Sequence, residues 1–214
     1  MYLTEIFRET EFAEIASLVE RHPLATLVTL QAGEIVADHI PFLLDAGGKT
    51  LRAHVARANP LWRAFDPSVD ALAIFSGVEH YVTPSWYATK RETGKVVPTW
   101  NYEVVHVYGR LRAIDEADWT RALLRDLTAR HEARRSKPWA VEDAPADFID
   151  AQSKAIVGIE IAVSRIEAKR KLSQNRNSAD RAGVIAGLLA EGDAGAEDMA
   201  KAMSANQPTP SLQK

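Results

Sequence analysis

Hydrophobic positions recur with a helical period near the start of the chain and with a period of two after it. Residues 10–22 place Phe12, Ile15 and Val19 on one helical face, and Pro23 ends that pattern. The alternation that follows predicts antiparallel strands joined by hairpins at glycine-containing turns. The expected strands are residues 24–30, 34–44, 50–55 and 71–75, with a short helix after Asn59–Pro60.

The second half of the chain has the same mixed character. A β-rich run covers residues 96–113, and residues 156–166 return to strict alternation. Between them, residues 115–135 and 145–154 have the apolar spacing of amphipathic helices. Few of these elements form β-α-β units, so we predict the α+β class, with an antiparallel barrel or sheet and peripheral helices.

The end of the chain differs in composition from the rest. Residues 192–214 are rich in Ala, Gly, Ser, Pro and Gln. Such a composition is typical of segments that cannot bury enough apolar surface to fold. We therefore predict one domain over residues 1–191 and a mobile C-terminal tail over residues 192–214.

Composition excludes several classes of protein. The chain has 214 residues, 46% of them hydrophobic and 26% charged, which is a globular balance. It lacks an apolar run of about 18 residues and has a charged N-terminal segment, so we expect no membrane span, no secretory signal and a cytoplasmic location. Because the chain has no cysteine, we expect no disulfide, thiolate metal site or cysteine nucleophile.

The formal charge of −3 provides no general attraction to DNA. DNA binding would need a local basic patch, and the one candidate lies between Arg165 and Arg181. It contains six cations and only two acids. A run of charge is also typical of a plain solvated face, and that alternative stays open.

Two segments have the residues that a phosphate and a flat heterocycle require. In LRAHVARANP, Arg57 follows a strand and precedes a helix start, where a guanidinium and exposed amides favour an anion. In HYVTPSWYATK, hydroxyl groups and Lys90 accompany adjacent aromatic rings. The alternatives are an ordinary surface arginine in the first segment and a solvated loop with packed aromatics in the second.

Two further segments are rich in polar and aromatic residues. In VPTWNYEVVHVYG, alternation places Thr99 and Asn101 on one face of the strand and Trp100 on the other. The aromatic face could equally belong to a plain core or to a dimer surface. KRKLSQNR offers cations and amides directly after the last strand. The six histidines are scattered singly, and no standard nucleotide, metalloprotease or nucleophile-elbow motif is present. We therefore assign no metal ligands and no catalytic residues.

Taken in order, the strings ADHIPFLL, LRAHVARANP, HYVTPSWYATK, KVVPTWNYEVVHVYG, IVGIEI and KLSQNR resemble the PaiB-like family of FMN-binding negative transcriptional regulators. The resemblance covers residue 1 to about residue 189. It implies an antiparallel split β-barrel of the FMN-binding type with peripheral helices. It also implies a homodimer with FMN as the cofactor at the subunit interface.

The resemblance also implies roles for particular residues. Arg57, Ser85 and Lys90 would hold the phosphate of FMN, while His54, Ala56 and Asn59 would line the pocket. Thr99, Trp100 and Asn101 would contact the ring from another strand or from the partner subunit. Lys171 and Gln174 would close the site.

Three functions remain open at this point. The leading one is a homodimeric FMN-binding transcriptional regulator, which lacks an evident helix-turn-helix and would reach DNA through the basic patch. The second is a flavin-dependent oxidoreductase of the pyridoxamine-phosphate oxidase-like class, for which the sequence identifies no substrate pocket, acid or base. The third is a split barrel that handles haem.

Overall fold

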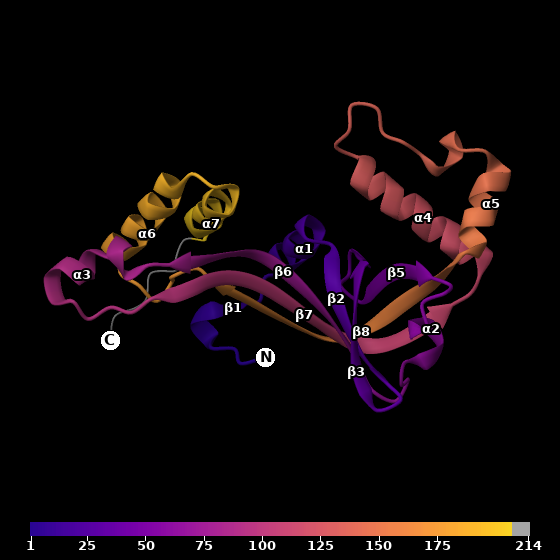
Figure 1. Ribbon diagram of the computed structural model, residues 1–214, viewed down its shortest axis with the longest axis horizontal. Helices are drawn as coiled ribbons and strands as arrows, with labels where there is room; N and C mark the ends of the chain where they lie inside the picture. The colour runs from indigo at the N-terminus through magenta and orange to yellow at the C-terminus, as the bar shows by residue number, and fades with distance from the viewer. Residues whose placement is uncertain (207–214) are drawn as a thin grey trace. The chain divides into compact units, whose positions relative to one another are not determined.

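The computed structural model describes residues 1–206, which form a mixed α+β fold (Figure 1). The helices are α1 (Phe12–Arg21), α2 (Leu61–Ala64), α3 (Ala88–Thr93), α4 (Ala117–Glu132), α5 (Ala146–Lys154), α6 (Ser178–Glu191) and α7 (Ala194–Ala205), with short 3-10 turns η1 (Glu5–Phe7), η2 (Pro84–Trp86) and η3 (Val141–Asp143). The strands are β1 (Arg8–Glu9), β2 (Leu24–Gln31), β3 (Glu34–Pro41), β4 (Leu43–Leu44), β5 (Thr50–Ala56), β6 (Ala71–Val82), β7 (Thr99–Ile114) and β8 (Ile156–Lys171).

The strands form one sheet in the order β3-β2-β6-β7-β8-β5-β4, with β1 also paired to β8. Five of its ladders, β1–β8, β2–β3, β2–β6, β4–β5 and β5–β8, are antiparallel. Among residues 1–206 no ladder joins β3 to β4, so the sheet stays open, as a split barrel requires. The predicted α+β class with an antiparallel sheet is confirmed.

The chain divides into two compact units, and β6, β7 and β8 contribute residues to both. The central unit consists of Ala16–Phe75 and His106–Ile166. The terminal unit consists of Met1–Ile15, Ser76–Val105 and Glu167–Lys214. Each unit is described separately below.

In the central unit, β2 and β3 form the predicted hairpin. Ala32 and Gly33 make its turn with φ angles of 50° and 87°, a conformation that glycine adopts without strain. Buried residues alternate along β2, so one face of this strand packs in the core. Strand β8 approaches β7 closely at Gly109, where an added Cβ would lie 2.1 Å from the carbonyl oxygen of Ala162. The strand contact itself therefore requires glycine at this position.

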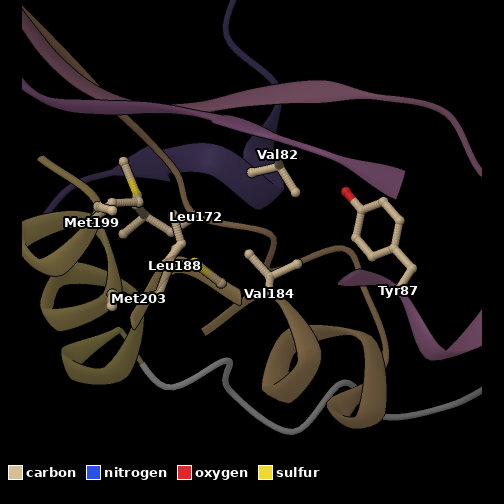
Figure 2. Close-up of a cluster of buried hydrophobic side chains, with 9 residues drawn as sticks. Val82, Tyr87, Leu172, Val184, Leu188, Met199 and Met203 are labelled. Carbon is tan, nitrogen blue, oxygen red and sulfur yellow. The ribbon is translucent and has the colours of Figure 1, made fainter. Parts of the chain in front are cut away.

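The terminal unit has its own hydrophobic core, built from the ends of the long strands and from α6 and α7 (Figure 2). Its members are buried apolar side chains from four segments of the sequence. They are Val82, Tyr87, Leu172, Val184, Leu188, Ala196, Met199, Ala200 and Met203.

Helix α7 lies where the sequence analysis expects a mobile tail. Residues 194–205 form a helix, and Met199 and Met203 on it are fully buried. Asp193 caps the helix by accepting a hydrogen bond from the amide of Ala196 at 2.9 Å. The structure thus differs from the expected tail over residues 194–205, because alanines and methionines supply an apolar face that composition alone does not indicate. Residues 207–214 of the expected tail lie outside the described residues.

Two strands also extend beyond their predicted ends. Strand β6 continues from residue 75 to Val82, and β8 continues from residue 166 to Lys171. Both extensions belong to the terminal unit and carry polar residues that interrupt simple alternation.

Among residues 1–206, the structure has no helix with both the length and the apolar character needed to cross a bilayer.

Helix α6 packs so closely on η2 that two of its positions require glycine. An added Cβ at Gly183 would lie 2.1 Å from the carbonyl oxygen of Trp86, and one at Gly187 would lie 2.4 Å from the ring of Trp86. Both contacts are shorter than any van der Waals contact. The helix can dock here only because these side chains are absent.

Gly183→Ala is therefore expected to destabilise the protein, although alanine is the better helix former. The clash is with backbone, and we expect a loss of about 1–3 kcal/mol in the unfolding free energy, measured by urea denaturation. Gly187→Ala is the matched variant, because the Trp86 ring there has more freedom to move, and its loss should be smaller. Equal or greater stability of Gly183→Ala would contradict the close packing of α6 on η2.

Candidate functional site

Three of the four predicted site residues of the central unit line one cavity. His54, Ala56 and Asn59 line a cavity of about 330 Å³ at the end of β5. The other lining residues come from β3, β5 and the start of β8. They are Asp38, His39, Ile40, Pro41, Val55 and Ile156. A cavity of this size is within the range of small-molecule sites in proteins.

Asn59 is fixed by two hydrogen bonds. Its amide nitrogen donates to Asp38 at 2.8 Å, and its side-chain oxygen accepts from the amide of Leu61 at 2.8 Å. The second bond holds the turn that leads into α2, whose N-cap is Pro60 and not the predicted Asn59. Asn59 therefore holds the wall of the cavity in place while its side chain is already paired.

His54 has an unsatisfied polar atom. Its Nδ1 is buried and has no hydrogen-bond partner among the described residues. Burial lowers the pKa of the imidazole, so the ring is neutral at neutral pH. His54 also lines a second cavity of about 330 Å³, which Trp139, Leu124 and Leu127 make largely apolar. A buried polar atom without a partner is costly, and a ligand hydrogen bond at this position would remove that cost.

Arg57 is not available in the way that the sequence analysis expects. Its guanidinium donates to both carboxylate oxygens of Asp115, at 2.7 and 2.6 Å, and to the backbone carbonyls of Lys154 and Ile156. The hydrogen bonds to Asp115 raise the pKa of Arg57, and those from Arg57 lower the pKa of Asp115. In this structure Arg57 therefore anchors the end of β5, and its phosphate role stays a prediction.

The remaining predicted site residues lie in the terminal unit. Lys90 donates to the hydroxyl of Ser85 at 3.0 Å, so these two predicted phosphate ligands are neighbours on the surface. Lys171 donates to the hydroxyl of Thr99 and to the carbonyl of Trp100. The structure thus brings together two predicted pairs, from η2 and α3 and from β7 and β8.

Lys171 lies in a cationic environment. Burial and then the charges of Lys169 and Arg176 lower its pKa. The two neighbouring cations lie over aromatic rings, Arg176 over Tyr87 at 4.6 Å and Lys169 over Tyr102 at 5.4 Å. An anion at this position would be stabilised by several positive charges at once.

Two predicted residues serve the internal structure of the terminal unit. Asn101 is fully buried, and its amide donates to the hydroxyl of Ser173 at 3.0 Å. Gln174 accepts from the amide of Leu172 at 2.7 Å and donates to the carbonyl of Arg170, which closes the turn after β8. Their proposed roles in contacting or closing a ligand site stay predictions. Trp100, by contrast, is 54% exposed and packs edge-on against Tyr81.

Two cations of the basic run, Arg170 in β8 and Arg181 in α6, are bonded inside the terminal unit. Arg170 pairs with Glu103, Glu9 and Glu14, and Arg181 donates to three backbone carbonyls inside the terminal unit. Burial lowers the pKa of Arg181. These two cations therefore stabilise the fold and do not form an open basic face.

Some cavity residues have no strong signal in the sequence. Asp38 and Ile156 reach the cavity because the end of β3 and the start of β8 both lie beside β5, a proximity that depends on the tertiary fold. Asp38 precedes His39 within a predicted strand. This pair of polar residues is a weak sequence signal for a site.

Two solved structures share the fold of this chain. A FAD- and haem-binding protein from Mycobacterium smegmatis superposes with a TM-score of 0.56 and 19% identity, covering 77% of this chain and 73% of that one. The flavocytochrome Anf3 from Azotobacter vinelandii superposes with a TM-score of 0.57 and 15% identity, covering 85% of this chain and 78% of that one. The predicted split-barrel class is thus confirmed by fold likeness.

Sequence similarity is more specific. The chain is 34% identical over 205 residues to the protease synthase and sporulation protein PAI 2 of Bacillus subtilis, covering 95% of this chain and 96% of that protein. Residues 1–165 match the family described as "Putative FMN-binding domain". This match agrees with FMN as the expected cofactor. The chain therefore belongs to this family of FMN-binding domains.

Proposed function

We propose that this protein binds FMN as a homodimer, with the flavin ring held at the His54 cavity, and that it has a regulatory role like that implied for its family. The observation that carries the proposal is the buried, unpartnered Nδ1 of His54 at the wall of a cavity of about 330 Å³. A neutral imidazole donates or accepts one hydrogen bond at Nδ1, and the polar edge of a flavin offers both acceptors and a donor.

The residues present fit such a group. The backbone and side chains around Ala56 and Ile156 form apolar wall, and Asp38, His39 and His54 supply polar atoms. Polar groups beside an apolar wall suit a cofactor site, because the polar groups fix the orientation of the ligand. FMN supplies redox chemistry when bound, and the chain supplies the hydrogen bond and the apolar wall.

In the homodimer, we propose that the phosphate of FMN binds the cationic positions of the partner subunit's terminal unit. Lys171 has its pKa lowered by burial and by two neighbouring cations, and a phosphate dianion would reverse that unfavourable charge balance. The Ser85–Lys90 pair offers a hydroxyl and a second cation. Arg57 has lower support for this role because Asp115 already occupies its guanidinium.

Two variants separate the ring contact from the phosphate contact. His54→Leu removes the hydrogen bond and keeps an apolar wall, so the Kd for both FMN and riboflavin should rise about tenfold. Lys171→Met removes a charge, so the Kd for FMN alone should rise about 10- to 100-fold, while riboflavin, which lacks the phosphate, binds as before. Fluorescence titration of flavin-stripped protein measures both constants.

Three outcomes of these titrations would contradict the proposal. Absence of FMN binding to the wild-type protein would remove the flavin function. An unchanged FMN affinity in His54→Leu would show that the flavin ring does not bind at the His54 cavity. Equal loss of FMN and riboflavin in Lys171→Met would show that Lys171 has no phosphate-specific role.

The dimer has its own support in the exposed apolar side chains of the terminal unit. Tyr81, Val97 and Trp100 are 43%, 65% and 54% exposed, although they are large and apolar. Sedimentation velocity of the flavin-loaded protein tests the dimer, and a flavin-bound monomer would contradict it.

Cell fractionation tests the cytoplasmic location, which we propose on composition alone.

The regulatory role rests on the family resemblance and on the similarity to PAI 2. Direct DNA contact has weaker support, because Arg170 and Arg181 of the basic run are already paired internally. Retention of the dimer on duplex DNA at low salt, with a steep loss as salt rises, would support direct contact. Without retention, regulation has to act through another partner. Reduction of the bound flavin by a nicotinamide cofactor would instead favour the oxidoreductase alternative. A Soret band after addition of haem would favour the alternative of a split barrel that handles haem.

A further inference from the structure

A histidine and two carboxylates, none of them a predicted site residue, meet in the terminal unit. His80 lies on β6, Glu191 is the last residue of α6, and Asp193 caps α7. The Nε2 of His80 lies 3.2 Å from a carboxylate oxygen of Glu191 and 3.9 Å from one of Asp193. One ligand atom from each of the three residues falls within 4.8 Å of the others.

The ring of His80 is oriented by groups outside this cluster. Its Nδ1 lies 2.7 Å from the carbonyl oxygen of Tyr81. A carbonyl only accepts, so Nδ1 carries the proton, and in the neutral ring Nε2 presents its lone pair to the two carboxylates. The ring also lies beside that of Trp86, with centroids 6.4 Å apart. A backbone acceptor at the far ring nitrogen is the usual arrangement behind a metal-binding histidine.

The two carboxylates are held by the turn between the helices. Gly192 has a φ of 72°, which ends α6 and reverses the chain so that Glu191 and Asp193 face the same side. One oxygen of Asp193 is used in capping Ala196, and the other points to His80. The cap therefore fixes one oxygen and leaves the second available.

We propose that His80, Glu191 and Asp193 bind one divalent transition-metal ion of the Zn²⁺ type, with solvent completing its coordination. Ligands about 2.0–2.2 Å from a tetrahedral zinc are roughly 3.3 Å from one another. The His80–Glu191 separation of 3.2 Å already has this value, and the His80–Asp193 separation of 3.9 Å needs only a small side-chain rotation.

The charge balance and the ligand types favour the same class of ion. Two carboxylates and a neutral imidazole have a net charge of −2, which one divalent cation neutralises. The imidazole nitrogen favours zinc and its transition-metal neighbours over calcium and magnesium, which prefer all-oxygen sites. A bound ion would join β6 to the α6–α7 turn and so brace the helical part of the terminal unit.

The alternative without a metal is an ion pair between protonated His80 and Glu191. It explains the short His80–Glu191 distance and predicts no specific metal binding. Direct titration of the full-length protein, treated with chelator and free of any histidine tag, separates the two. We expect one Zn²⁺ per chain in competition with a chromophoric chelator, and a Co²⁺ absorption spectrum typical of four-coordination.

Two variants and a matched control locate the site. His80→Asn keeps a donor toward Tyr81 but lacks Nε2, and Glu191→Gln removes one anionic ligand. Each should raise the Kd for Zn²⁺ by about 10- to 100-fold or more, since even the loss of an orienting partner has such an effect. The control Glu197→Gln removes a carboxylate of α7 that lies outside the cluster, and its Zn²⁺ affinity should equal that of the wild type.

A thermal measurement gives an independent readout. Zn²⁺ should raise the unfolding midpoint of the wild type and of Glu197→Gln but not that of His80→Asn. The proposal is overturned by absence of stoichiometric Zn²⁺ binding, or by binding that His80→Asn and Glu191→Gln leave unchanged. Neither measurement requires flavin, so a failure here is distinct from a failure of the proposed flavin function.

Discussion

Replacing Arg170 by methionine is expected to lower the unfolding free energy by about 3–5 kcal/mol. Arg170 donates to Glu103 at 2.7 Å and pairs with Glu14 at 3.0 Å and Glu9 at 3.3 Å. The Glu103 side chain has no exposed surface, so the variant would leave a carboxylate buried without its cation. Such a charge is far more costly than the loss of a surface ion pair. Urea denaturation followed by circular dichroism measures the change.

A double-mutant cycle tests the physical reason. In the Arg170→Met background, Glu103→Gln should restore much of the lost stability, because it removes the uncompensated charge. The control is Glu14→Gln, which removes the most exposed partner of Arg170 and should cost less than about 1 kcal/mol. If Arg170→Met costs no more than Glu14→Gln, the buried ion cluster does not contribute as described.

The same variant bears on the basic run as a DNA-binding surface. A cation that contacts phosphate on an open face affects DNA retention and leaves stability unchanged. A cation that neutralises a buried carboxylate affects stability first. The expected result for Arg170→Met therefore places Arg170 in the fold, and the sequence alone could not indicate this because Glu9, Glu14 and Glu103 are far from Arg170 along the chain.

The strands and helices of the central unit could be predicted from local pattern. Alternation along β2 and the turn at Gly33 determine the hairpin, and the apolar stripe of α4 determines that helix. In the terminal unit, the strand ends carry charged residues whose partners are distant in sequence. Local patterns therefore ended β6 and β8 too early and missed the docking of α6, whose contact with Trp86 depends on Gly183 and Gly187.

The candidate site was predictable only as far as its residues are close in sequence. His54, Ala56 and Asn59 belong to one short segment, and they do line one cavity. The assignment of Arg57 to phosphate could not anticipate Asp115, which comes from the segment before α4. The cluster of His80, Glu191 and Asp193 left no sequence signal, because a single histidine and two surface acids have no characteristic spacing.

Removing the two buried methionine side chains of α7 is expected to have the largest effect on stability. Met199 and Met203 are fully buried one helical turn apart, packed with Val82, Leu172 and Leu188 (Figure 2). A buried methionine replaced by alanine costs about 2–5 kcal/mol through lost burial and the cavity left behind. Because the two side chains share one core, their effects need not add, and we expect a loss of at least about 4 kcal/mol for the double variant.

The loss should also be visible locally. Arg181 donates to the carbonyls of Met203 and Asn206, so a loosened α7 deprives this buried cation of two acceptors. Hydrogen exchange of the amides of residues 194–205 should accelerate in Met199→Ala/Met203→Ala and stay slow in Lys201→Ala, which changes a side chain that is 70% exposed. A segment that contributes nothing to the core would show equal stability and exchange in both variants. That result would return residues 194–205 to the tail that their composition predicts, whereas the expected difference makes α7 part of the folded terminal unit.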